Sequence, residues 1–287
     1  MALDYARIKH WAFPEIRQSY AAKDSIFYAL GLGLGEDPVD ARQLRYVYED
    51  GLKAFPTQAV VLAYPGFWMQ NPETGIDWVK VVHGEQRLRL HRPLPAAGTV
   101  RARAHVSHVI DKGAGKGALV ITERTLVDDA TGEALATLAQ TTFCRADGGF
   151  GQGDAPPEPL PAVPERAPDA VREIAILPQA ALLYRLNADP NPLHADPAVA
   201  RAAGFERPIL HGLCTYGVAA RALLDAFAGG DGDRLAELNV RFSRPVFPGE
   251  TLQVRMWREA DGRVRFDARI PARDVTVLSH GVAELRP

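Results

Sequence analysis

Alternating apolar and polar residues occur in both halves of the chain, each time after a turn rich in proline and glycine. In the first half, residues 92–99 (RPLPAAGT) lead into 100–106 (VRARAHV), where every second side chain is apolar. In the second half, residues 244–250 (RPVFPGE) lead into 251–256 (TLQVRM) with the same alternation. A period of two predicts a strand with one buried face, and its recurrence predicts a duplicated module.

Turn-forming residues continue each half as a strand meander. Residues 112–117 (KGAGKG) and 128–132 (DDATG) supply hairpin turns in the first half. Residues 261–262 (DG) and 271–274 (PARD) do the same in the second half. Glycine and aspartate at such positions favour the tight turns that join antiparallel strands.

Each half also holds a stretch with helical spacing before its meander. Residues 23–32 (KDSIFYALGL) offer Asp24 or Ser25 as an N-cap, and residues 212–227 (GLCTYGVAARALLDAF) end before a pair of glycines. A central helix wrapped by a long antiparallel sheet is the hot-dog arrangement. The predicted fold class is therefore α+β, a double hot-dog with two hot-dog modules in one chain.

A proline-rich segment separates the halves. Residues 154–168 (DAPPEPLPAVPERAP) contain six prolines, which prevent helix and sheet and favour an extended spacer. The predicted organisation is an N-terminal module at 1–153, a linker at 154–168 and a C-terminal module at 169–287.

Composition and charge narrow the class of protein. The chain has 287 residues, 47% of them apolar, and a formal net charge of −2 without a basic stripe, so nucleic acid is not an expected partner. No segment reaches the length of a membrane-spanning helix, and neither end resembles a signal peptide or a peroxisomal address, so we expect a cytoplasmic protein. The two cysteines, Cys144 and Cys214, are expected to be small buried residues.

The chemistry-bearing residues lie in one segment, 184–215 (YRLNADPNPLHADPAVARAAGFERPILHGLCT). Asp189 and His194 are five residues apart in a loop stiffened by Pro190 and Pro192, with Asn191 between them. Taken alone, such a loop is also typical of a plain proline turn in which the aspartate caps its own backbone.

The same segment resembles the hydratase motif of the MaoC-like family, which includes the hydratase part of the peroxisomal multifunctional enzyme of beta-oxidation. One departure is Ala188, where the family usually has glycine. The resemblance implies an (R)-specific enoyl-CoA hydratase that acts on an acyl-CoA. We expect no cofactor beyond the coenzyme A of the substrate, no metal because the histidines do not form a spaced ligand set, and a homodimer. The matching residues are Asp189, Asn191, Pro192, Leu193, His194, Gly204, Phe205 and 208–212 (PILHG).

Hydration requires a base for water, a proton for the alpha carbon and stabilisation of a thioester enolate. By analogy with the family, Asp189 activates the water and His194 shares it as the partner acid or base, while Asn191 orients the dyad or the water. Gly212 opens the second predicted helix, where its N–H favours a developing oxyanion on the thioester. For His211, a brace for the helix and a place in the site remain open.

The resemblance extends into the first half of the chain. It implies that Glu49 is needed for activity and that the CoA ester is contacted at His83, Gly84, Lys112, Gly212 and Phe242. A surface glutamate, a hairpin lysine and a core aromatic are the plain structural interpretations of Glu49, Lys112 and Phe242.

Two other functions remain open at this point. A hot-dog thioesterase would share the fold without needing the loop at 189–194, and a non-catalytic acyl-CoA-binding protein would need neither Asp189 nor His194. We also expect a medium, long or bulky acyl chain. The stretch of the first half that matches the catalytic region, residues 55–71, has no such loop and is broken by Pro56 and Pro65.

Overall fold

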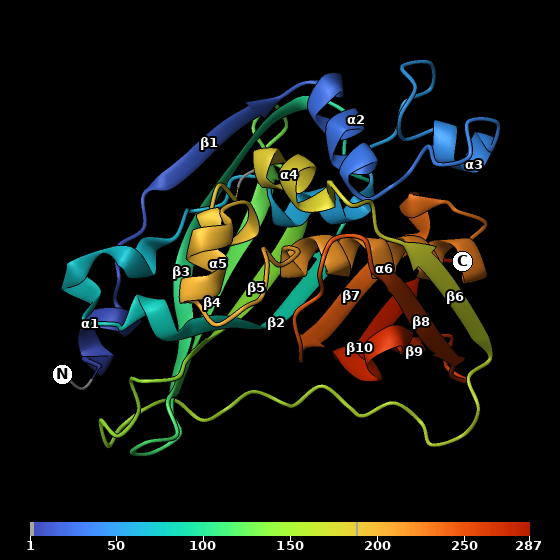
Figure 1. Cartoon of the computed structure of the whole chain (residues 1–287). Helices are drawn as coiled ribbons and strands as arrows, with labels where there is room; N and C mark the ends of the chain where they lie inside the picture. Colours follow the sequence, from blue (N-terminus) through green and yellow to red (C-terminus); the bar gives the residue numbers. More distant parts are fainter. Residues whose placement is uncertain (1–2, 188) are drawn as a thin grey trace.

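The computed structural model describes residues 3–187 and 189–287. Within them, ten strands form one antiparallel sheet in the order β1-β3-β4-β5-β2-β7-β10-β9-β8-β6 (Figure 1). The first five in chain order are β1 (Glu15–Tyr20), β2 (Val81–Leu90), β3 (Gly98–Asp111), β4 (Ala118–Asp128) and β5 (Ala134–Cys144). The other five are β6 (Ala170–Ala175), β7 (Leu235–Phe242), β8 (Thr251–Arg258), β9 (Val264–Ile270) and β10 (Val275–Leu285).

The strand order confirms the predicted duplication. Strands β1 to β5 are arranged 1-3-4-5-2 from one edge of the sheet. Strands β6 to β10, counted from the opposite edge, have the same order, 6-8-9-10-7. The two modules meet where β2 pairs with β7, in a register that sets Glu85 opposite Arg241 and Leu88 opposite Leu238. The chain therefore folds as a double hot-dog.

Short helices surround one long helix. The α-helices are α1 (Tyr5–Lys9), α2 (Ala22–Gly31), α3 (Ala41–Leu44), α4 (Ala180–Tyr184), α5 (Pro197–Ala202) and α6 (Gly212–Phe227). The 3-10 turns are η1 (Pro56–Val60), η2 (Trp68–Gln70), η3 (Pro72–Thr74), η4 (Trp78–Lys80), η5 (Arg185–Asn187), η6 (Pro192–His194), η7 (Gly232–Arg234) and η8 (Pro271–Arg273). None of the described helices is long and apolar enough to cross a membrane.

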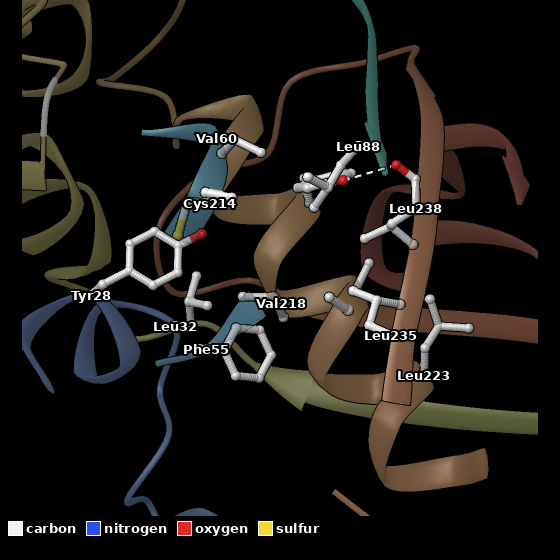
Figure 2. Packing of buried hydrophobic residues seen from close by; sticks show 14 of the residues in the cluster. Tyr28, Leu32, Phe55, Val60, Leu88, Cys214, Val218, Leu223, Leu235 and Leu238 are labelled. Atoms are coloured by element: carbon white, nitrogen blue, oxygen red, sulfur yellow. Dashed lines mark hydrogen bonds between the residues drawn. The ribbon is translucent and has the colours of Figure 1, made fainter. Parts of the chain in front are cut away.

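Helix α6 is the central helix of the C-terminal module. All residues from Cys214 to Leu224 are buried, and apolar side chains predominate on every face of this stretch. Leu223 of the helix lies close to Leu235 of β7, and the Tyr216 hydroxyl donates to the Leu238 carbonyl at 2.9 Å (Figure 2). Cys214 is fully buried at the first turn, and Cys144 is buried as well, as predicted for both cysteines.

The centre of the N-terminal module differs from the prediction. The predicted helix forms at Ala22–Gly31, but it packs against α4, whereas the turn η1 contacts α6. Pro56 starts η1 at a favourable first position, and the turn ends at Val60. Ala63 has a positive φ of 44° and Pro65 disfavours a helical conformation at Tyr64, so the turn cannot extend into a long helix.

The linker runs along the outer side of the sheet, between the end of β5 and the start of β6 (Figure 1). The Trp257 indole donates to the carbonyl of Arg166 at 2.7 Å, and the Arg265 guanidinium donates to that of Ala162 at 2.6 Å. Leu160 of this segment is buried as well. The Arg87 guanidinium of β2 also donates to the Glu158 carbonyl at 3.1 Å, so side chains of both modules hold the proline-rich segment.

Candidate active site

The segment that carries the motif is built from short capped turns. The Asn191 side chain accepts from the Leu193 N–H at 3.0 Å and so caps η6, which has Pro192 at its first position. The Asp189 carboxylate accepts from the Asn191 N–H at 3.2 Å. Asn191 therefore shapes the loop through its side-chain oxygen. Ala188, the departure from the family motif, lies outside the described residues.

Asp189 and His194 face each other across this loop. Asp189 Oδ2 lies 4.0 Å from His194 Nε2, which is too long for a direct hydrogen bond. The His194 side chain is 9% exposed and that of Asp189 is 45% exposed. A buried imidazole beside an accessible carboxylate at this separation can hold one water molecule between them.

The hydrogen bonds of His194 fix its tautomer. Its Nδ1 lies 2.8 Å from the Ile209 carbonyl oxygen, which can only accept, so Nδ1 carries the proton. Nε2 is then an acceptor directed at Asp189. Burial lowers the pKa of His194, while the Ile209 carbonyl and the Asp189 charge act in the opposite direction. The imidazole is therefore neutral near pH 7 and ready to take a proton.

His211 contacts both members of the pair. Its ring stacks on that of His194, with centroids 3.6 Å apart and an interplanar angle of 26°. Its Nε2 donates to the backbone carbonyl of Asp189 at 3.2 Å, and its Nδ1 is buried without a partner in the described structure. Burial and the neighbouring His194 lower the pKa of His211 to about 3, so it stays neutral. The structure assigns His211 to the site as a positioning residue.

The three side chains also form a potential metal-ligand group. One ligand atom from each of Asp189, His194 and His211 lies within 4.8 Å of the others. Sequence spacing did not suggest this group because His211 is 17 positions after His194. The two ring N–H groups are committed to backbone carbonyls, which leaves one nitrogen on each ring for a proton or a cation. The expected absence of a metal remains a prediction.

Gly212 follows His211 in the chain and occupies the first position of α6. Its N–H has no partner among the described residues, as is usual in the first turn of a helix. A Cβ at Gly212 would lie 3.1 Å from the Phe242 ring, and that ring is 4.5 Å from the His83 ring. The predicted contacts Gly212, Phe242 and His83 are thus brought together, and close packing is a second reason for the glycine.

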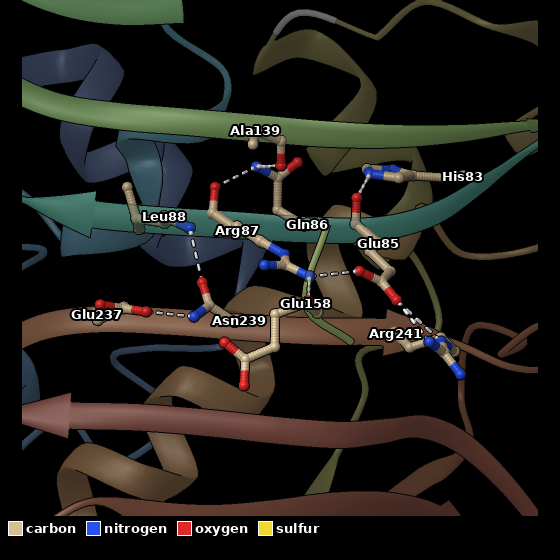
Figure 3. A network of polar contacts seen from close by, with 10 residues as sticks. All are labelled: His83, Glu85, Gln86, Arg87, Leu88, Ala139, Glu158, Glu237, Asn239 and Arg241. Carbon is tan, nitrogen blue, oxygen red and sulfur yellow. Dashed lines mark hydrogen bonds and ion pairs between the residues drawn. The ribbon is translucent and has the colours of Figure 1, made fainter. Parts of the chain in front are cut away.

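A bulge in β2 shapes the His83 end of this surface. The register of β2 with β5 shifts between His83 and Glu85, and a Cβ at Gly84 would lie 3.2 Å from the Thr141 carbonyl oxygen. Figure 3 shows the Glu85 carboxylate between two guanidiniums, of which Arg241 of β7 donates at 2.8 Å and 3.0 Å. Burial lowers the pKa of His83 to about 4. Glu85 ties the two modules together where the predicted CoA contacts lie.

Lys112 lies in the hairpin after β3, near the same end of the sheet. Its ammonium is 4.6 Å from the centre of the Phe143 ring, and Phe143 pairs with Val82, the neighbour of His83. It is therefore placed to reach a ligand that extends from His83 along this edge.

Glu49 lies elsewhere. It is exposed in the loop between α3 and η1, and the flanking Arg45 and Lys53 both pair with Asp231, beyond the C-terminal end of α6. Gly212 begins the same helix, whose 16 residues span roughly 24 Å. No contact in the described part of the chain groups Glu49 with the dyad, so its need for activity stays a prediction.

Two tyrosines near the dyad were not singled out from the sequence. The Tyr184 ring is 5.1 Å from the His211 ring, and its buried hydroxyl has no partner in the described structure. Tyr64 is near enough to Asp189 that the carboxylate charge, after burial, raises the Tyr64 pKa. Tyr184 opens the motif segment, but Tyr64 belongs to the other module, and only the folded structure brings it here.

The chain resembles known proteins over nearly its whole length. Residues 160–278 match the MaoC like domain, and residues 18–146 match the MFE-2 hydratase 2 N-terminal domain. The chain is 42% identical over 282 residues to enoyl-CoA hydratase ChsH3 of Mycobacterium tuberculosis, covering 96% of this chain and 95% of that protein. It is 40% identical over 286 residues to peroxisomal multifunctional enzyme type 2 of Mus musculus, covering 96% of this chain and 37% of that longer protein.

A solved structure agrees with these matches. The crystal structure of a MaoC-like dehydratase from Phytophthora capsici superposes with a TM-score of 0.85 at 35% identity and covers 98% of both chains. The domain matches fall on the two halves that the strand order relates, and the dyad lies in the half that matches the MaoC like domain. The chain belongs to the MaoC-like family, in the two-module form whose first module is the MFE-2 hydratase 2 N-terminal domain.

Proposed function

We propose that the protein adds water to a trans-2-enoyl-CoA and releases the (R)-3-hydroxyacyl-CoA, in fatty-acyl or related beta-oxidation. The observation that carries the proposal is the pair Asp189 and His194, 4.0 Å apart, beside the free N–H of Gly212. Relatives with this architecture bear the name enoyl-CoA hydratase.

The chemistry follows from the tautomer of His194. Its Nε2 accepts a proton from the water that Asp189 also contacts, and the hydroxide oxygen forms a bond to the beta carbon. The electrons of the double bond move to the thioester oxygen, where the Gly212 N–H stabilises the charge. The imidazolium, stabilised by the Asp189 carboxylate, then returns the proton to the alpha carbon. One water is consumed, and the atoms and charges balance.

The stereochemistry comes from the fixed position of the water. Because Asp189 and His194 hold it on one side of the substrate, hydroxide reaches one face of the double bond, and the same side delivers the alpha proton. The test is to follow the ultraviolet absorbance of the conjugated thioester and to analyse the chirality of the product. Bleaching with an (R)-hydroxyacyl product supports the proposal, and an (S)-product contradicts it.

The same assay separates the alternatives. A thioesterase would release the free thiol of CoA, and an acyl-CoA-binding protein would leave the absorbance unchanged. Hydration is the function that the Asp189–His194 pair and the relatives named enoyl-CoA hydratase support together.

The proposal also covers the substrate class, the cofactors, the location and the oligomeric state of the enzyme. The substrate is an acyl-CoA, no metal or further cofactor is required, and the enzyme works in the cytoplasm as a homodimer. Dialysis against a chelator should leave kcat unchanged, because the Asp189 and His194 side chains supply the proton transfers. Light scattering on the purified protein tests the dimer, and a single-chain mass in solution would contradict it.

A further inference from the structure

Arg124 is an arginine buried in the N-terminal module. It lies on β4, its side chain is directed at the core with those of Val120 and Leu126, and it is 6% exposed. One guanidinium nitrogen donates to the Val60 carbonyl at 2.7 Å, and Nε has no partner in the described structure. The Tyr64 ring covers the guanidinium at 5.6 Å.

Unlike the other two buried arginines, Arg124 has no acidic partner in the described part of the chain. Arg221 pairs with Glu36 at 3.1 Å, and Arg265 has Glu259 at 3.7 Å. No carboxylate forms an ion pair with Arg124 in the described part of the chain. Burial lowers the pKa of Arg124 to about 10, so it remains charged near pH 7. A buried, unpaired charge is costly and is typical of a site that receives an anion.

The turn that accepts from the guanidinium contacts α6, the helix that begins in the candidate active site. Its acceptor Val60 packs beside Cys214, in the first turn of α6 and two residues after Gly212 (Figure 2). Its neighbour Tyr64 is close enough to Asp189 for the carboxylate charge to raise the Tyr64 pKa. Arg124 therefore lies on the N-terminal module's side of the dyad, where the short turn η1 replaces a long helix.

The two modules differ in polarity on this inner face. In the C-terminal module the strand equivalent to β4 is β9, and its core-facing residues are all apolar and buried: Val264, Phe266, Ala268 and Ile270. In the N-terminal module, Thr122 is the residue before Arg124 on the same face of β4. Its partner on β5 is Gln140, which is also polar. A surface that binds only a hydrocarbon acyl tail does not need these polar side chains.

We propose that Arg124 and Tyr64 form a subsite for a carboxylate carried by the acyl chain, so that the preferred substrate is an enoyl-CoA whose far end is acidic. The proposal rests on the proposed hydratase function and names the substrate class of that site. The carboxylate would accept from the unpartnered Nε and an adjacent guanidinium nitrogen, a geometry in which arginine binds carboxylates in two parallel hydrogen bonds. The Tyr64 ring would hold the guanidinium plane in place.

The test compares two series of trans-2-enoyl-CoA substrates of equal length, one ending in a methyl group and one in a carboxylate. At the length that spans the distance to Arg124, kcat/KM for the carboxylated substrate should exceed that for its methyl-ended match by about 10- to 100-fold, the worth of a charged hydrogen bond. The Arg124→Met variant should abolish this ratio while retaining turnover of the methyl-ended substrates. Arg124→Lys should restore part of the ratio.

The matched control is Arg265→Met, which removes a similarly buried arginine that binds a linker carbonyl away from the dyad; its ratio should equal that of the wild type. A wild-type enzyme that favours methyl-ended substrates at every length would overturn the subsite, as would an unchanged ratio in folded Arg124→Met. If Arg124→Met fails to fold, the wild-type ratio of kcat/KM for the two substrate series still tests the subsite. If no enoyl-CoA is hydrated, the hydratase proposal fails separately. The subsite is then tested by calorimetry, as the ratio of the affinities for saturated acyl-CoAs of equal length that end in a carboxylate or in a methyl group.

Discussion

Desolvation keeps three histidines around the site neutral, of which His194 and His211 are buried and His83 is half-buried. Burial lowers the pKa of His83 to about 4 and that of His211 to about 3, and it lowers the pKa of His194 as well. In the unfolded chain each would take up a proton near pH 6.5. The unfolded state therefore binds more protons between these values, so the stability from the neutral histidines is complete above about pH 6.5 and is lost as the pH falls toward about 3.

A pH series checks this directly. The thermal midpoint should decrease as the pH falls from about 7 to about 4, and His83→Gln should make the decrease shallower, since a tenfold difference in proton affinity between the folded and unfolded states corresponds to about 1.4 kcal/mol. His91→Gln, at an exposed position, serves as the control and should follow the wild type. For activity, the acidic limb of kcat/KM should lie below about pH 6.5, since His194 must be neutral to accept a proton. A limb at or above that pH would contradict the burial argument.

At the level of single residues, the motif predicted the dyad but not its surroundings. Asp189, Asn191 and His194 are close in sequence, so a local pattern was enough to group them. The contact of His211 with the Asp189 carbonyl and the stacking of its ring depend on how α6 docks against the loop. Arg124 and Tyr64 come from a different module, and nothing in their local sequence indicates that the guanidinium is buried without an acid.

Among the elements, α6 combines two requirements at Gly212. The N–H must be free for the thioester oxygen, and the missing side chain leaves room for the Phe242 ring, which would lie 3.1 Å from a Cβ. We predict that Gly212→Ala lowers the free energy of unfolding by about 1–3 kcal/mol through overpacking and lowers kcat/KM about tenfold or more. Adding Phe242→Leu should recover stability without recovering the rate, measured by denaturant unfolding beside kinetics. Unchanged stability in Gly212→Ala would refute the packing account.

We propose that the short turn η1 leaves space for the acyl chain. It has five residues where the other module has the 16 residues of α6, and Pro65 and the positive φ of Ala63 prevent a longer helix. We predict that decenoyl-CoA is preferred over crotonyl-CoA by at least about tenfold in kcat/KM, because added methylenes are buried beside η1. A steep preference for crotonyl-CoA in steady-state kinetics would contradict this.

Prediction at the level of elements succeeded where periodicity was strong. The alternating runs became β3 and β8, and the apolar stretch at 212–227 became α6 with those bounds. The prediction failed for the centre of the first module, because the helix at Ala22–Gly31 has the right local pattern but docks against α4. Periodicity identifies a helix and does not specify which element will pack against it.

In the whole molecule, the site depends on both modules. The dyad loop and Gly212 come from the C-terminal module, while His83, Lys112, Tyr64 and Arg124 come from the N-terminal one. The β2–β7 pairing and the Glu85–Arg241 ion pair hold the two together. In the proposed function, one module holds the proton-transfer residues and the other contributes the surface for the substrate, and η1 and α6 differ accordingly.

The most direct test of the hydratase account is the turnover of folded Asp189→Asn protein with a trans-2-enoyl-CoA. The substitution keeps the size of the side chain and removes the charge that stabilises the imidazolium, so kcat should fall by about 10²- to 10⁴-fold. The thermal midpoint should stay near that of the wild type because the Asp189 side chain is 45% exposed. His194→Ala should give a similar loss, and the double variant little more, since both residues serve one water. Near-wild-type turnover in folded Asp189→Asn would contradict the account.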